Sequence, residues 1–103
     1  MVVKCGEAQR PMLMEYLAKE GVYHAFLMAD IENYGFDKEF QTVYGDWNGE
    51  NLCGVYLRFY ENLILSADKR GVNREFLRQL FQRWQPGVVM GKLETAEQVS
   101  ALL

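Results

Sequence analysis

Residues Thr42–Tyr60 read TVYGDWNGENLCGVYLRFY and carry the strongest local structural signal in the chain. Their valine, threonine and aromatic residues favour β-strands. Between two strand-like runs stands Asn48-Gly49, a pair that tolerates the positive φ angles of a two-residue type I′ turn. The pattern predicts an antiparallel hairpin with strands over Thr42–Trp47 and Leu52–Tyr60. The second strand is apolar on both faces, which predicts a central strand covered on each side.

The segment after the hairpin extends the sheet and then covers it. Glu61-Asn62 predicts a second tight turn, after which Leu63–Ala67 completes a three-stranded meander. Asp68–Gly71 is a polar loop, and Asn73 is placed to cap a helix. This helix is expected to pack on the sheet through one broad apolar face, formed by Phe76, Leu77, Leu80, Phe81 and Trp84.

The last part of the chain predicts one more strand and one more helix. Pro86-Gly87 ends the preceding helix, and Val88–Met90 is typical of a fifth strand. Thr95 and Gln98 have the spacing of a capping box that opens a final helix. That helix would carry an apolar face of Val99, Leu102 and Leu103.

The part before the hairpin predicts one strand and two helices. Val2–Cys5 is a short strand, followed by a helix in which Pro11 lies in the first turn and which Gly21 ends. A second, shorter helix carries Phe26, Leu27, Ile31 and Tyr34 and ends at Gly35. The predicted order is therefore β-α-α-β-β-β-α-β-α, an α+β fold with a mainly antiparallel sheet and flanking helices.

Composition sets limits on the class of protein. A chain of 103 residues, 50% of them hydrophobic, has the size of a single domain spanning residues 1–103. The net charge of -3 disfavours nucleic acid as a partner. No segment has the length and apolarity of a membrane span, and no leader peptide is recognisable, so we expect a cytoplasmic protein without membrane contacts. Cys5 and Cys53 have no metal-like spacing and are expected to be buried, reduced thiols.

Candidate chemical groups are few. His24 is the only histidine, and neither cysteine stands in a nucleophile-like motif, so a structural or surface histidine is favoured over a catalytic one. Four carboxylates cluster around the second helix without the ligand spacing of a calcium loop, which favours a solvated acidic face over a metal site: Asp30, Glu32, Asp37 and Glu39. No metal and no catalytic residue is nominated.

The order of elements, over the full sequence, resembles the first part of the GNAT (N-acetyltransferase) fold. The segments Phe26–Asp37, Val43–Asp46 and Leu57–Tyr60 are similar to the N-terminal region of bacterial two-part GNAT-family proteins. The resemblance implies a degenerate GNAT-like lobe that precedes a downstream catalytic domain of the same chain. It also implies that the sequence is a fragment of a longer protein, because the GNAT fold continues into further strands.

The resemblance points to one candidate cofactor site. GNAT enzymes bind the acetyl-CoA pyrophosphate with backbone amides of a [QR]-x-x-G-x-[GA] loop between the fourth strand and the next helix. The equivalent stretch here is Asp68–Asn73, and its weak candidates for the CoA pyrophosphate are Lys69, Arg70, Gly71 and Asn73. Only Gly71 fits the motif, since Asp68 places a carboxylate and Asn73 a side chain where the family needs other residues. We expect no tight binding of acetyl-CoA to this chain.

Two functions remain open. The first is an N-terminal domain of an N-acetyltransferase, which shapes the acceptor side or the assembly of the parent protein without catalysing by itself. Tyr56, Tyr60 and Glu61 are conceivable bases, although packing and turn roles suit them better. The alternative is a non-enzymatic interaction module that uses a sheet edge or the acidic helical face. If the chain is such a fragment, the uncovered edge at Val88–Met90 and the apolar face of the last helix favour a homo-oligomer at high concentration.

Overall fold

The computed structural model describes residues 1–19 and 21–103 and has the expected order of elements. In chain order these are β1 (Val2–Lys4), a 3₁₀ turn (Glu7–Gln9), α1 (Arg10–Leu17), α2 (Val22–Tyr34), β2 (Gln41–Asn48), β3 (Asn51–Phe59), β4 (Asn62–Ala67), α3 (Arg74–Phe81), β5 (Val88–Met90) and α4 (Leu93–Ser100). The α+β class and the mainly antiparallel sheet are confirmed. Among the described residues, no helix is long and apolar enough to cross a bilayer.

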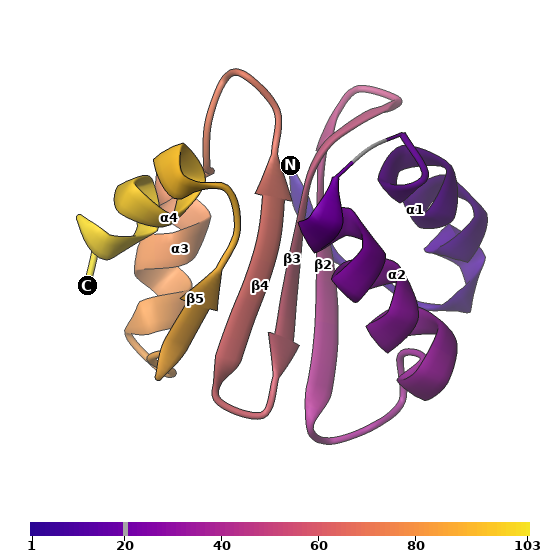
Figure 1. Ribbon diagram of the computed structural model, residues 1–103, viewed down its shortest axis with the longest axis horizontal. Helices are drawn as coiled ribbons and strands as arrows, with labels where there is room; N and C mark the ends of the chain where they lie inside the picture. Colours follow the sequence, from indigo (N-terminus) through magenta and orange to yellow (C-terminus); the bar gives the residue numbers. More distant parts are fainter. Residues whose placement is uncertain (20) are drawn as a thin grey trace.

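The sheet has the strand order β1-β2-β3-β4-β5, so neighbours in space are also neighbours in sequence. The first three pairs are antiparallel, and β4 and β5 are parallel. A parallel pair needs a crossover connection, which α3 provides. Figure 1 shows that α1 and α2 cover one face of the sheet while α3 and α4 cover the other.

Helices on both faces give the molecule two hydrophobic cores, because successive side chains of a strand point to opposite faces. In β3, Val55 and Leu57 join the core under α1 and α2, whereas Tyr56 joins the core under α3 and α4. All three are at most 1% exposed. The prediction that β3 is a central strand covered on each side is therefore confirmed.

Both tight turns of the meander lie one residue away from the predicted positions. Asn48 pairs with Asn51, so the first turn consists of Gly49, which has a φ of 64°, and Glu50. A glycine at the first central position is typical of a type II′ turn, and the predicted type I′ turn at Asn48-Gly49 is wrong. In the second turn Phe59 pairs with Asn62, which places Tyr60 and Glu61 at the bend.

The lengths and ends of three helices also differ from the predictions. The second helix, with 13 residues, is longer than the first, with 8. Gly21, with a φ of 95°, directly precedes α2 and does not end α1. The last helix begins at Leu93 and not at a capping box on Thr95, and the Gln98 side chain accepts from the Val72 amide instead. At Gly21, the glycine marks a chain reversal without saying which side of it is helical.

The N-cap of α3 is confirmed, since the Asn73 side-chain oxygen accepts a hydrogen bond from the Phe76 amide at 3.0 Å. Of the expected apolar face, Leu77, Leu80 and Phe81 are buried. Phe76 and Trp84 are only half-buried and pack against the rim of this core. Trp84 lies beyond the last residue of α3, which explains why its indole is not enclosed.

Candidate functional site

The parallel pairing of β4 and β5 ends before β4 does, because β5 ends at Met90. Their last pair is Ile64 with Met90, whereas β4 remains paired with β3 as far as Ala67. A cavity of about 410 Å³ lies beyond the end of β5, beside the last residues of β4. In open sheets with parallel strands, ligands bind at the carboxyl ends of such strands. The volume also falls within the usual range of small-molecule pockets.

The cavity is built by five segments that are distant in the sequence. The end of α1, the start of α2, the end of β4, the following loop and the first turns of α4 all contribute side chains, among them Tyr16, His24, Ser66, Lys69 and Gln98. A smaller cavity of about 200 Å³ adjoins it and shares His24, Ser66 and Lys92 with it. The pair His24 and Ser66 therefore faces both spaces.

Ser66 is the centre of a short polar chain in this cavity. It follows the buried Ile64 by two residues on β4, so its side chain points to the face covered by α1 and α2. His24 Nε2 lies 2.6 Å from Ser66 Oγ, and the Tyr16 hydroxyl lies 3.2 Å from the same oxygen. Burial raises the pKa of Tyr16, so its phenol stays neutral at neutral pH.

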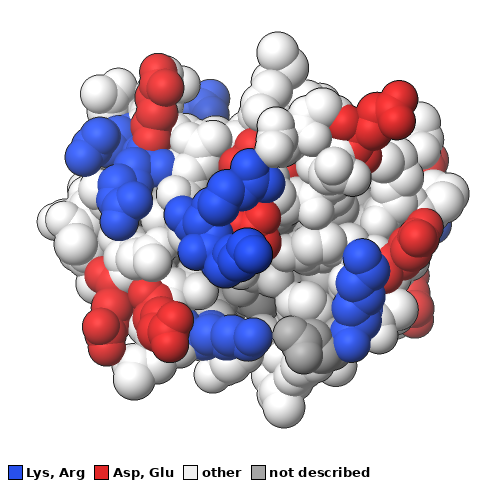
Figure 2. Space-filling model, turned by 90° about the horizontal axis from the view of Figure 1, so that it is seen from above, with Lys and Arg blue, Asp and Glu red and all other residues white. Residues whose placement is uncertain are grey.

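The surroundings of the cavity are locally basic although the chain is acidic overall. Figure 2 views the molecule from the end toward which β4 points, and it shows basic side chains gathered in the middle of that face. Lys19, Lys69 and Lys92 line the larger cavity, together with the carboxylates of Asp68 and Glu94. Among the described lining residues, the three ammonium groups outnumber the two carboxylates by one, which favours anionic ligands over cationic ones by a small margin.

In the loop proposed for the CoA pyrophosphate, the backbone amides donate hydrogen bonds to acceptors within the protein. The Arg70 amide donates to Asp68 Oδ1 at 2.9 Å, and the Gly71 amide donates to the Asp68 carbonyl at 2.9 Å. The Val72 amide donates to Gln98 Oε1 at 2.9 Å, and the Asn73 amide donates to the Tyr56 hydroxyl at 2.8 Å. Four consecutive amides are thus engaged within the protein. A pyrophosphate held by backbone amides does not fit this loop.

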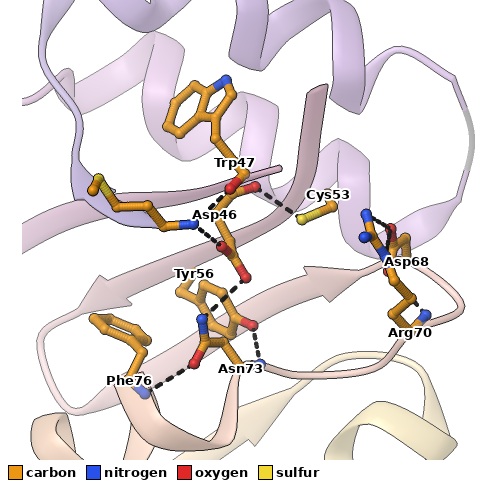
Figure 3. A network of polar contacts seen from close by, with 9 residues as sticks. Asp46, Trp47, Cys53, Tyr56, Asp68, Arg70, Asn73 and Phe76 are labelled. Carbon is orange, nitrogen blue, oxygen red and sulfur yellow. Dashed lines mark hydrogen bonds and ion pairs between the residues drawn. The ribbon is translucent and has the colours of Figure 1, made fainter. Parts of the chain in front are cut away.

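The four candidate residues of that loop do not converge on one space. Lys69 and Gly71 line the larger cavity, whereas Arg70 and Asn73 line a neighbouring depression beside β2 that also includes Gly71. Arg70 forms an ion pair with Asp68 at 3.2 Å. Asn73 donates from its side chain to Asp46 Oδ2 at 3.3 Å, and Figure 3 shows these two side chains facing one another.

The other residues that the sequence offers as bases or thiols lie away from the cavity or have side chains whose burial disfavours ionisation. Tyr56 is 1% exposed, and burial raises its pKa to about 12. Tyr60 and Glu61 form the turn before β4, at the opposite end of that strand from Ser66. Burial raises the pKa of the Cys5 thiol to about 11, and Cys53 is half-buried, not fully buried as expected.

The acidic cluster around α2 holds no recognisable metal site. Glu32, Asp37 and Glu39 are exposed, while Asp30 is half-buried and its pKa is raised by desolvation. Within residues 1–19 and 21–103, no group of three His, Cys, Asp or Glu side chains is placed to hold a metal ion.

The sequence does not predict the contact between His24 and Ser66, because Ser66 is 42 residues away and stands in no motif. Its only local signal is the polar serine after a continuous apolar run in β4. Comparisons of the chain with protein-family models and with curated proteins give no match.

Proposed function

We propose that this chain is the N-terminal GNAT-like lobe of an N-acetyltransferase and that it shapes the acceptor side or the assembly of the parent enzyme without catalysing the transfer from acetyl-CoA. One observation carries the proposal: a cavity lies at the end of β4, beyond the parallel pair β4 and β5, within the expected order of elements. The place where the fourth strand meets the next helix is where GNAT proteins bind their cofactor.

The loop geometry supports the non-catalytic part of the proposal. In this lobe the Asp68 carboxylate, the Gln98 amide oxygen and the Tyr56 hydroxyl occupy the amides that a pyrophosphate would need. Displacing them breaks hydrogen bonds worth about 1 kcal/mol each, and Asp68 adds charge repulsion. Chemistry in the parent protein then belongs to the downstream domain.

Calorimetric titration of the chain with acetyl-CoA tests the cofactor part. We expect a dissociation constant weaker than about 10 μM, which corresponds to roughly 7 kcal/mol. Asp68→Ala removes one of the internal acceptors and a negative charge, and it is expected to strengthen binding modestly. Tight binding by the unmodified chain would contradict the degenerate loop.

Extension of the chain with its natural downstream sequence tests the acetyltransferase part. We expect the extended protein to release free thiol from acetyl-CoA in the presence of amines, and the isolated chain to release none. A reading frame that stops after Leu103 would contradict the proposal and would favour the second candidate below.

An interaction module is the second candidate, and the edge strand β5 favours it. Val88 in this strand is 48% exposed, and β5 is the last strand of the sheet beside β4. Exposed strand edges pair with other strands. Light scattering over a concentration series is expected to show self-association that Val88→Lys reduces, with Val22→Lys on α2 as a control because Val22 is also exposed. Equal behaviour of both variants would exclude β5 as the contact.

A further inference from the structure

We propose that Ser66 is a nucleophile for acyl groups, with His24 as its general base, and that its substrate is a small activated acyl compound whose leaving group is already negatively charged in the donor. The proposal is independent of the acetyltransferase function, because the loop amides discussed above take no part in it.

The arrangement of His24 and Ser66 carries the proposal. Their atoms Nε2 and Oγ are 2.6 Å apart, which is within the range of nucleophile and base pairs in covalent catalysis. Ser66 is the fifth residue of the six-residue strand β4, and His24 is the third residue of α2, so both side chains stand on regular elements. Both also line the two adjoining cavities, which gives the hydroxyl access to a ligand.

The backbone next to Ser66 supplies a donor for the developing oxyanion. The Asp68 amide donates to the Cys53 carbonyl of β3 at 2.9 Å. Amides alternate in direction along an antiparallel pair, so the Ala67 amide points away from β3, toward the side of β5, which ends at Met90. Ala67 also lines the cavity. The amide of the residue that follows a nucleophile is a common oxyanion donor in serine hydrolases.

Charge around the cavity selects the leaving group. Lys19, Lys69 and Lys92 line the larger cavity, where they attract a phosphate or carboxylate and stabilise negative charge that develops on it. Asp68 and Glu94 lie among them and keep the net positive charge small. An acyl phosphate matches this environment better than a neutral ester.

The proposed step balances as a simple acyl transfer. With the imidazole proton on Nδ1, His24 Nε2 takes the proton of the Ser66 hydroxyl while Oγ attacks the acyl carbon. The bond between the acyl carbon and the leaving oxygen breaks, and the leaving phosphate departs with the proton that His24 releases. Ser66 then carries an ester, and water restores the hydroxyl and yields the carboxylic acid. No oxidant or reductant is involved.

The experiment uses two acyl donors and the two serines of the chain. Acetyl phosphate and p-nitrophenyl acetate are incubated with the protein, and the modified residue is located by peptide mass spectrometry. Ser66 and Ser100 are the only serines, and Ser100 is exposed on α4, so Ser100→Ala is a matched control. We expect acetylation of Ser66 and not of Ser100, and loss of the nitrophenolate burst in Ser66→Ala but not in Ser100→Ala.

Three further variants separate a nucleophile from a purely structural hydroxyl. His24→Gln keeps a hydrogen-bonding side chain but no base, and we expect it to slow the burst by about 100-fold or more. Ser66→Cys retains a nucleophile and should still be acylated. This result would show that the loss of the burst in Ser66→Ala comes from the missing nucleophile and not from a folding defect. Lys69→Ala should slow the reaction with acetyl phosphate but not with p-nitrophenyl acetate.

Each outcome decides a part of the proposal. If lysines or Ser100 are acetylated at the rate seen for Ser66, or if the burst is unchanged in folded Ser66→Ala, Ser66 is not the nucleophile. If the burst is unchanged in His24→Gln, His24 is not the general base. Equal effects of Lys69→Ala on both donors would overturn the preference for a donor whose leaving group is already negatively charged.

Discussion

The side-chain oxygen of Gln98, on α4, accepts a hydrogen bond from the Val72 amide at 2.9 Å and thereby ties the last helix to the loop that leads into α3. Val72 is 5% exposed and packs in the core under α3 and α4. The contact joins two segments that are 26 residues apart, and it closes the wall of the cavity on the side of α4.

Removal of this acceptor is expected to destabilise the fold. Gln98→Ala leaves the Val72 amide without its partner in a part-buried position, which should lower the free energy of unfolding by about 1 to 3 kcal/mol. Urea unfolding monitored by circular dichroism measures the change. Gln79→Ala, at an exposed position of α3, is the control and should change stability by less than about 0.5 kcal/mol.

Gly71 should be far less tolerant of alanine than Gly49. Both have positive φ angles, of 87° and 64°, so alanine is strained at either position. A Cβ atom at Gly71 would also stand 2.7 Å from Gln98 Oε1, whereas nothing lies within 4 Å of one at Gly49. We expect Gly71→Ala to cost more than Gly49→Ala in chemical unfolding. Equal costs would mean that Gln98 moves aside freely.

Trp84 and Leu77 test how much each residue contributes to the core under α3. Leu77 is 0% exposed, and Leu77→Ala should cost about 2 to 5 kcal/mol. Trp84 is half-buried at the rim, so Trp84→Ala should cost less than Leu77→Ala, at about 1 to 3 kcal/mol. A larger loss for Trp84→Ala, by denaturant titration of both variants, would place its indole deeper than the structure does.

Alkaline pH should weaken the fold through Tyr56. Burial raises its pKa from 10.0 to about 12 in the folded state, so the unfolded chain releases this proton first. Stability is therefore complete below pH 10 and falls as the pH rises from about 10 to 12, by about 2 to 3 kcal/mol at the upper end. Unfolding midpoints across this range measure the loss.

Tyr56→Phe provides the control for that titration. It removes the ionisable group, so the alkaline loss should become smaller, and the remainder belongs to groups such as Tyr16. The variant is also expected to lose about 1 to 3 kcal/mol at neutral pH, since the Asn73 amide loses its acceptor. An unchanged alkaline slope would show that Tyr56 already ionises with an ordinary pKa.

Local sequence patterns predicted the elements and their order, because strand alternation, the Asn73 cap and the apolar face of α3 are properties of neighbouring residues. The turn positions were less predictable. Whether Asn48 belongs to the turn or to the ladder depends on its pairing with Asn51, which the pair Asn48-Gly49 does not encode.

Such local patterns do not predict the cavity. The contact between His24 and Ser66 exists only after α2 has packed against β4, and no spacing along the chain anticipates it. Similarly, the residues of the Asp68–Asn73 loop indicate a departure from a phosphate loop, but two of the acceptors that engage its amides, Tyr56 and Gln98, come from β3 and α4.

The connections of the sheet set the order in which the chain assembles. Strands β2, β3 and β4 follow one another through two-residue turns, so their pairing closes only short loops and can form early. In contrast, Val2 of β1 pairs with Asp46, across both N-terminal helices. We expect the meander to fold first and β1 to join late, so that during synthesis β1 stays unpaired until β2 has been made.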